Sequence, residues 1–156
     1  MSDTLQNVLD QISREFSYIF SETKYPGIPR IERIPIQNTP FDINGVTITP
    51  IEVLHHKLPV MGFRINDLAY ITDANFISNE EKNKLQGLEV LVLNALQIKK
   101  HISHFTLNEA IELINELKPE KAYLVHISHK LGLSREINPT LPNNISLAYD
   151  GLRLSI

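Results

Sequence analysis

The apolar, strand-like runs of this chain repeatedly give way to residues that can bind metal. The six histidines fall into three close pairs at such positions, His55 with His56, His101 with His104, and His126 with His129. Asp73 closes the run from Leu68 in the same manner. Strand ends at one rim of a sheet bring distant residues to one point, and imidazole is a common ligand of divalent zinc, iron and manganese. The pattern therefore predicts a metal centre.

Composition narrows the class of protein. The chain has 156 residues, of which 42% are hydrophobic, enough for one domain spanning 1–156 with a real core. A net charge of -3 argues against nucleic acid as a partner. The chain has no cysteine, so a metal would be held by nitrogen and oxygen alone. We see neither a basic-then-apolar leader nor a run of about 20 apolar residues, so we expect a soluble, cytoplasmic protein without a membrane partner.

The first part of the chain predicts one helix followed by strands. Apolar residues recur at helical spacing from Leu5 to Ile19, which predicts an amphipathic helix ending near Ser21. Two prolines and a glycine within 24–29 favour turns. Residues 31–36 alternate as in a strand, and Asn44-Gly45 between alternating apolar residues predicts a hairpin turn.

Further strands follow along the middle of the chain. The second strand of that hairpin is expected to run on to His55, and 62–72 predicts another hairpin that turns at Asn66-Asp67. Ser78 can cap a short helix through Leu85. The dense apolar run 88–94 is typical of a buried strand.

The C-terminal part predicts strand, helix and strand. A capping-box pattern over 106–109 opens a helix that Pro119 stops. Residues 122–125 predict a short buried strand before the third histidine pair, and 145–156 predict a terminal hairpin around Asp150-Gly151. This element order predicts an α/β domain with a mixed sheet and helices on one face.

Each histidine also has an ordinary structural interpretation. Strand neighbours point to opposite faces, so His55 and His56 cannot both face one site while the strand continues. His101 and His104 precede the Thr106 cap, where a helix N-terminus favours an anion such as a substrate phosphate, although His104 could equally tie down the loop. The spacing of His126 and His129 alone is weak evidence for zinc, and Asp73 could simply cap a turn.

Several motifs together carry more information than any one of them. They are Glu52–His55 with Leu58–Arg64, Tyr70–Ala74, Ser103–Leu107 and Tyr123–His129. In this order they resemble the metallo-β-lactamase-fold hydrolases, and the branch they resemble most is the phosphoribosyl cyclic phosphate phosphodiesterase-like proteins. The resemblance runs from about Phe16 to Ile156.

The resemblance implies a fold, a reaction and a set of residues. The family fold is an αββα sandwich of two similar halves, of which this chain resembles the C-terminal half and the linker before it. Two zinc or manganese ions would share Asp73, with His55 as a ligand of one metal and His126 of the other. His104 resembles a catalytic histidine, acting as a general acid or a phosphate contact. The implied substrate is a small, cyclic phosphodiester.

One departure limits that expectation. The family signature His-x-His-x-Asp-His is absent, because no histidine precedes His55, and His56 replaces a usual glycine. Each metal would keep only two ligands, so we expect weak binding and no activity from the chain by itself. Met1 resembles an internal start, which suggests a truncated protein. The bared sheet face predicts self-association or a complementing N-terminal chain. The alternative is a non-catalytic remnant or interaction domain.

Overall fold

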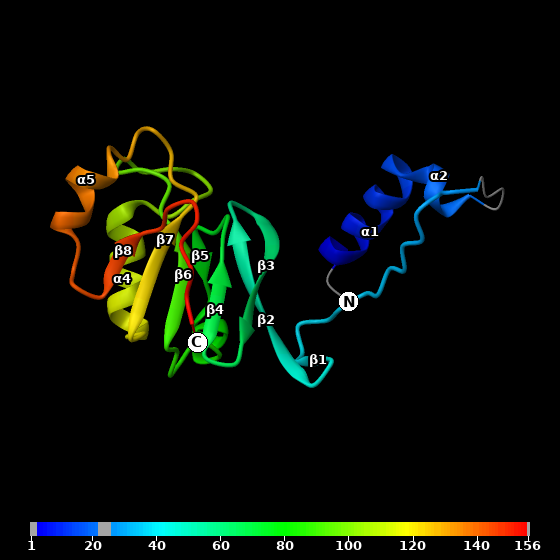
Figure 1. The fold of residues 1–156 in the computed structure, drawn as a ribbon, viewed down its shortest axis with the longest axis horizontal. Helices are drawn as coiled ribbons and strands as arrows, with labels where there is room; N and C mark the ends of the chain where they lie inside the picture. Colours follow the sequence, from blue (N-terminus) through cyan, green and yellow to red (C-terminus); the bar gives the residue numbers. More distant parts are fainter. Residues whose placement is uncertain (1–2, 22–25, 156) are drawn as a thin grey trace. The chain divides into compact units, whose positions relative to one another are not determined.

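The computed structural model describes residues 3–21 and 26–155. The chain divides into two compact units, Met1–Thr39 and Pro40–Ile156, so a single domain over 1–156 stays a prediction. Within the described residues, no helix combines the length and apolar character needed to cross a membrane. Figure 1 shows both units as ribbons.

The N-terminal unit is helical and then irregular. The predicted helix forms as α1 (Asp3–Glu15) and α2 (Ser17–Phe20), separated at Phe16, whose φ of -112° and ψ of 37° are not helical. Residues 22–25 lie outside the described residues, and residues 26–30 are irregular, as the prolines predict. The Arg33 guanidinium lies 4.2 Å from the centroid of the Phe20 ring, in a cation–π contact.

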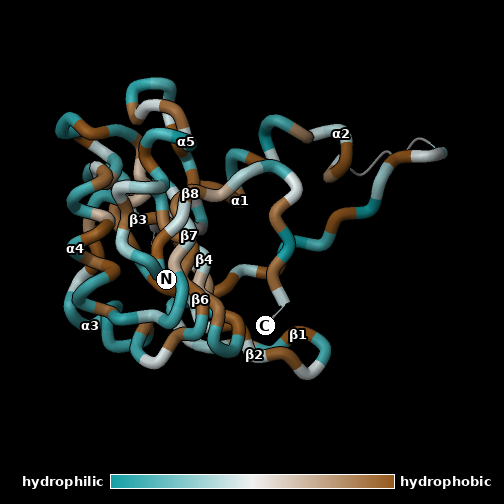
Figure 2. Tube along the Cα trace, turned by 60° about the vertical axis from the view of Figure 1, so that its left-hand side comes forward, coloured by the Kyte–Doolittle hydropathy of each residue, from teal (hydrophilic) through white to brown (hydrophobic). Residues whose placement is uncertain are grey.

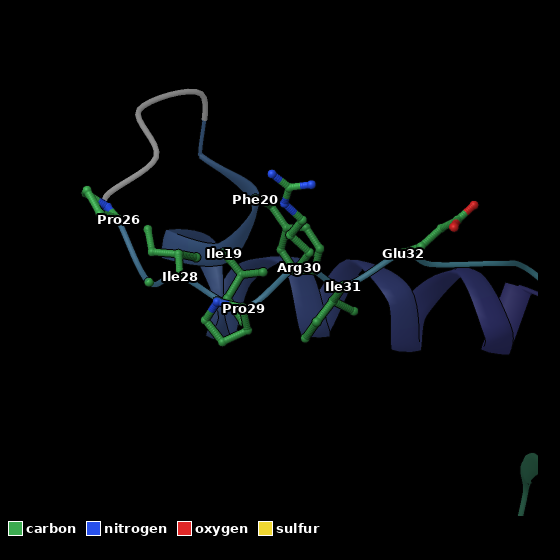
Figure 3. Close-up of a pocket in the computed structure, with 9 residues that line it drawn as sticks. Ile19, Phe20, Pro26, Ile28, Pro29, Arg30, Ile31 and Glu32 are labelled. Carbon is green, nitrogen blue, oxygen red and sulfur yellow. The ribbon is translucent and has the colours of Figure 1, made fainter.

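The strand predicted over 31–36 does not form. In the described part of the chain these residues pair with no strand, and Ile34 is 71% exposed. Pro35 has no N–H to donate to a ladder, and alternation alone cannot hold an extended segment that has no neighbour. The segment instead contributes to a hollow of about 660 Å³ in this unit (Figure 3). Its lining residues include no histidine and no aspartate; they are Ile19, Phe20, Pro26, Gly27, Ile28, Pro29, Arg30, Ile31 and Glu32.

The C-terminal unit is built on a mixed sheet. Its strands are β1 (Phe41–Ile43), β2 (Val46–His55), β3 (Leu58–Ile65), β4 (Leu68–Ile71), β5 (Phe76–Ile77), β6 (Val90–Asn94), β7 (Lys121–Val125) and β8 (Ile145–Leu147). The order across the sheet is β1-β2-β3-β4-β6-β7-β8, with β5 beside β2. Pairing is antiparallel from β1 to β4 and parallel from β4 to β8. The predicted α/β class and mixed sheet are therefore confirmed.

Local turn chemistry produces the antiparallel part. Asn44 and Gly45 both have positive φ, 52° and 83°, as a two-residue type I′ turn requires, so the first predicted hairpin is confirmed. Asn66, with φ of 51°, begins the turn between β3 and β4. The two turns fix the register of β1 with β2 and of β3 with β4.

The helices of this unit are α3 (Asn79–Asn83), α4 (Leu107–Leu117) and α5 (Ser134–Ile137), followed by the 3₁₀ turn η1 (Asn138–Thr140). The predicted capping box is present: Thr106 Oγ1 accepts from the Glu109 N–H, and the Glu109 carboxylate accepts from the Thr106 N–H. Partial burial raises the pKa of Glu109, but these hydrogen bonds and Lys100 outweigh it, so the net pKa is lowered. Ser78 caps α3, which ends at Asn83 rather than Leu85.

The two faces of the sheet differ in how they are covered. Buried Ile71, Leu93 and Leu124 face the core that α4 completes with its own apolar side, seen as brown alternating with teal along α4 in Figure 2. On the opposite face one row runs Phe63, Tyr70, Val92, Tyr123 across four strands. Tyr70 in that row is 48% exposed. An apolar row is therefore only partly covered.

The C-terminal prediction was half right. Residues 149–152 turn around Asp150-Gly151, where the Leu152 N–H donates to the Tyr149 carbonyl. Residues 152–155, however, are irregular, and Ile156 lies outside the described residues. The β8 strand pairs in parallel with β7 rather than with a returning strand, so the predicted terminal hairpin is wrong. The short β5 strand was not predicted, because two residues carry no periodicity.

Candidate metal centre

Parallel pairing brings three of the predicted site residues to one edge of the sheet. Asp73 lies two residues after β4, His126 directly follows β7, and His104 lies in the loop between β6 and α4. Because β4, β6 and β7 are parallel neighbours, the segments that follow them leave the sheet at the same edge. One ligand atom from each of the three residues lies within 4.8 Å of the other two.

The distances within this group suit a bound cation. Asp73 Oδ1 lies 3.1 Å from His126 Nε2 and 3.4 Å from His104 Nε2. Ligand atoms about 2.0–2.1 Å from a tetrahedral zinc ion are separated by roughly 3.3–3.4 Å. Asp73 Oδ1 therefore lies from each imidazole nitrogen at about the distance that separates neighbouring ligands of one ion.

The aspartate oxygen gives an independent indication. Asp73 Oδ1 is buried and makes no well-formed hydrogen bond among the described residues, although the two imidazole nitrogens lie 3.1 and 3.4 Å away. Such an atom is costly to keep, because a buried acceptor without a donor loses about 1–3 kcal/mol of desolvation energy. A divalent cation bound by this oxygen and by the His126 imidazole would satisfy it, with the His104 imidazole beside the ion. Carboxylate oxygens and imidazole nitrogens are ligands that zinc and manganese accept.

Asp73 and His126 share an unusual backbone conformation. Their φ angles are 55° and 54°, in the left-handed region. This region costs a residue other than glycine roughly 1–3 kcal/mol and persists where the surrounding structure imposes it. Both residues come just after a parallel strand, and the left-handed turn directs each side chain to the sheet edge rather than along the strand. Backbone strain thus coincides with the two residues that lie closest together.

His55 lies beside this group. It is the last residue of β2, and its ring meets the His104 ring edge-on with centroids 4.7 Å apart. Its ligand atoms are not among those within 4.8 Å of one another, so its predicted metal role stays a prediction. His56 has φ of 58°, and its N–H donates to Asn75 Oδ1. The strand has ended there, and the two neighbours diverge.

The surroundings of His104 keep it neutral. The side chain is 11% exposed, and its ring stacks on that of His126 with centroids 4.7 Å apart. Burial lowers the pKa of His104, the nearby His126 and His55 lower it further, and Asp73 opposes them without reversing the shift. His104 is therefore mostly neutral at pH 7 and can present either a lone pair or an N–H at Nε2.

The other side of His104 contacts residues that sequence reasoning did not assign. Its Nδ1 lies 3.1 Å from His101 Nδ1 and 3.0 Å from Ser103 Oγ. A hydrogen bond at Nδ1 sets the tautomer of His104, and with it whether the Nε2 that faces Asp73 carries a proton. The three-residue spacing of the histidines was visible in the sequence, but their Nδ1 contact depends on how the loop folds. His129 is exposed and lies outside the group.

Comparisons with known proteins agree with this architecture. The sequence model of the beta-lactamase superfamily domain matches residues 4–127, which include all four predicted site residues. The chain is 35% identical over 153 residues to an octanoyltransferase of Porphyromonas gingivalis (strain ATCC BAA-308 / W83), covering 97% of the chain and 31% of that protein.

Solved structures give the same result. A diphosphatase from the PhnP family superposes with a TM-score of 0.85 and 31% identity, over 95% of this chain and 55% of that one. Zinc-bound PqqB from Methylobacterium extorquens superposes with a TM-score of 0.68 and 16% identity, over all of this chain and 63% of that one, and so shares the fold. The chain thus spans about a third to two thirds of the length of these relatives.

Proposed function

The chain belongs to the metallo-β-lactamase-fold hydrolases, and on that premise we propose that it carries one half of a two-metal centre that hydrolyses a small phosphodiester. The convergence of Asp73, His104 and His126 around an unsatisfied buried oxygen is the observation that supports this proposal. Similarity to a PhnP-family diphosphatase supports the choice of a phosphate ester.

Each residue has a proposed role. Asp73 would bridge two zinc or manganese ions, with His55 and His126 as the ligands on either side. His104 would contact the substrate phosphate or donate a proton to the leaving oxygen, since its buried ring is held by His101 and Ser103. Bound divalent ions would supply an activated water and neutralise phosphate charge.

The remaining ligands would come from polypeptide outside these 156 residues. No His-x-His-x-Asp-His sequence occurs in the chain, and the chain spans 55% of the PhnP-family structure. We propose that a second βα half on a complementing chain supplies these ligands and covers the row of Phe63, Tyr70, Val92 and Tyr123. Self-association would cover the row without supplying the ligands. That partly covered row, in which Tyr70 is 48% exposed, also supports the second candidate function, a non-catalytic interaction domain that retains the fold.

A complementation assay separates these two functions. Zinc or manganese is titrated into the chain alone and into its mixture with an N-terminal half that carries the signature, and hydrolysis of bis-p-nitrophenyl phosphate is followed. We expect weak binding and no turnover from the chain alone, and tight binding with turnover from the mixture. His126→Ala should abolish both. A mixture that forms a complex but binds no metal would exclude the enzyme and leave the interaction domain.

The same assay assigns His104. His55→Ala should raise the Kd for zinc by more than about tenfold, as expected for a ligand. His104→Ala should leave the Kd within about threefold and lower kcat about 100-fold or more, as expected for an acid or a phosphate contact. His129→Ala is the matched control, because that histidine is exposed and lies outside the group. If His104→Ala weakens zinc binding as much as His55→Ala, His104 is a ligand.

A further inference from the structure

The buried amide side chain of Asn94 bonds both backbone polar groups of Ala74, the residue after Asp73. Asn94 is fully buried at the end of β6. Its Oδ1 accepts from the Ala74 N–H at 2.9 Å, and its Nδ2 donates to the Ala74 carbonyl at 2.9 Å. Ala74 directly follows Asp73, so the pair of bonds holds the two peptide groups on either side of Ala74, one of which is joined to Asp73.

These two side-chain hydrogen bonds replace backbone hydrogen bonds between neighbouring strands of the sheet. The β4–β6 ladder ends with Ile71 opposite Leu93, and beyond it the chain turns away through Asp73 in the left-handed conformation. A backbone that leaves its strand loses its ladder hydrogen bonds, and these must be replaced if the segment is buried. The amide of Asn94 replaces them in a geometry that requires the turn at Asp73.

The residues after Asn94 reach the other two members of the group. The Ala95 N–H donates to the carbonyl of Val125, which precedes His126, at 3.0 Å. The Leu96 N–H donates to the carbonyl of Phe105, which follows His104, at 3.0 Å. The Phe105 N–H in turn donates to the Ala74 carbonyl at 2.8 Å. One short segment, 94–96, is therefore bonded beside Asp73, His104 and His126.

From this arrangement we infer that Asn94 is a positioning residue: it holds Asp73 in the left-handed conformation that directs its carboxylate toward His126. The effect of Asn94 on the conformation of Asp73 is inferred from the hydrogen bonds alone. Its effect on metal affinity rests also on the proposed metal function. Asn94 is not among the residues proposed to bind metal or substrate. Residues that orient metal ligands from behind typically change metal affinity by about 10–100-fold when they are replaced.

Two variants test the inference. Asn94→Leu keeps the size of the side chain and removes both bonds, whereas Asn94→Asp keeps the acceptor for the Ala74 N–H and removes the donor. We expect Asn94→Leu to raise the Kd for zinc about 10–100-fold, measured on the complemented protein by competition with a chelator. Asn94→Asp should also weaken binding. In the metal-free chain, the backbone ¹³C and ¹⁵N shifts of Asp73 and Ala74 should move in both variants.

The control is Leu93→Ala. Leu93 precedes Asn94 and is fully buried in the core that α4 completes, and no side-chain hydrogen bond joins it to Ala74 among the described residues. The Leu93→Ala variant should have a lower unfolding midpoint, but its zinc Kd should stay within about threefold and its Asp73 shifts should not move. Unchanged shifts and affinity in the Asn94 variants, or an equal loss of affinity in Leu93→Ala, would overturn the inference. If Asn94→Leu does not fold, Asn94→Asp decides the same comparison. If the unaltered protein binds no zinc, the proposed function fails, and the shifts still decide the role of Asn94.

Discussion

Replacing Asp73 by asparagine should abolish high-affinity metal binding by the complemented protein without unfolding the chain. Asparagine has nearly the same shape and adopts the left-handed conformation readily, so the φ of 55° is retained. It lacks the negative charge that a ligand shared by two metals must supply. We expect the Kd for zinc to rise by more than about 100-fold, because a ligand contributes more than the outer residues that orient it.

The same substitution should leave stability equal or slightly higher in the metal-free chain. Asp73 Oδ1 is a buried acceptor without a hydrogen bond among the described residues, and a neutral amide is less costly at that point. Competition with a chromophoric chelator gives the Kd, and thermal unfolding in chelator gives the stability. Asp150→Asn is the control, since that aspartate is exposed in a turn. Zinc affinity equal in Asp73→Asn and the unaltered chain would exclude Asp73 as a ligand.

Local signals account for most of what the sequence predicted correctly. The turn at Asn44-Gly45 and the capping box at Thr106 depend on a few adjacent residues whose conformational preferences are strong. The buried strand 88–94 depends on a dense apolar run. In each case the physical cause lies within a short window, so the element follows from the residues themselves.

Elements that need a distant partner were predicted poorly. Residues 31–36 and 152–155 alternate as strands do, yet neither segment pairs with a neighbour in the described part of the chain. A strand is stable only where another strand supplies hydrogen bonds, and alternation does not report whether one is present. The sequence therefore indicated the capacity for a strand and not its formation.

The candidate site shows the same division. The sequence placed Asp73 and His126 after strands and so predicted that they would meet at one sheet edge, which the parallel pairing of β4, β6 and β7 produces. It did not predict their left-handed backbone or the bonds from Asn94 to Ala74. The signal visible in the sequence was Asn94, a polar residue at the end of an apolar strand. Its partner Ala74 is 20 residues away, so only the fold identifies the contact.

The second large effect concerns the ion pair that fastens α3 to the strand leading to His55. The Glu81 carboxylate, which is 9% exposed, accepts from the Lys84 ammonium at 2.9 Å and from the Glu52 N–H at 2.9 Å. Lys84→Met would remove the Lys84 countercharge from this buried carboxylate. Removing one partner of a buried pair costs up to about 3–5 kcal/mol, and because Lys84 is 25% exposed we expect about 2–4 kcal/mol.

A double replacement separates the charge from the packing. Glu81→Leu with Lys84→Met removes both charges and keeps apolar volume, so it should recover most of the stability that Lys84→Met alone loses, minus the loss of the bond to Glu52. Urea unfolding of the four proteins in the cycle gives the coupling free energy. The exposed pair Arg135 and Glu136, 3.8 Å apart, is the control and should contribute less than about 1 kcal/mol. If Lys84→Met costs no more than Arg135→Met, then the Glu81–Lys84 pair does not anchor α3, and packing and the hydrogen bond from the Glu52 N–H to Glu81 hold it against β2.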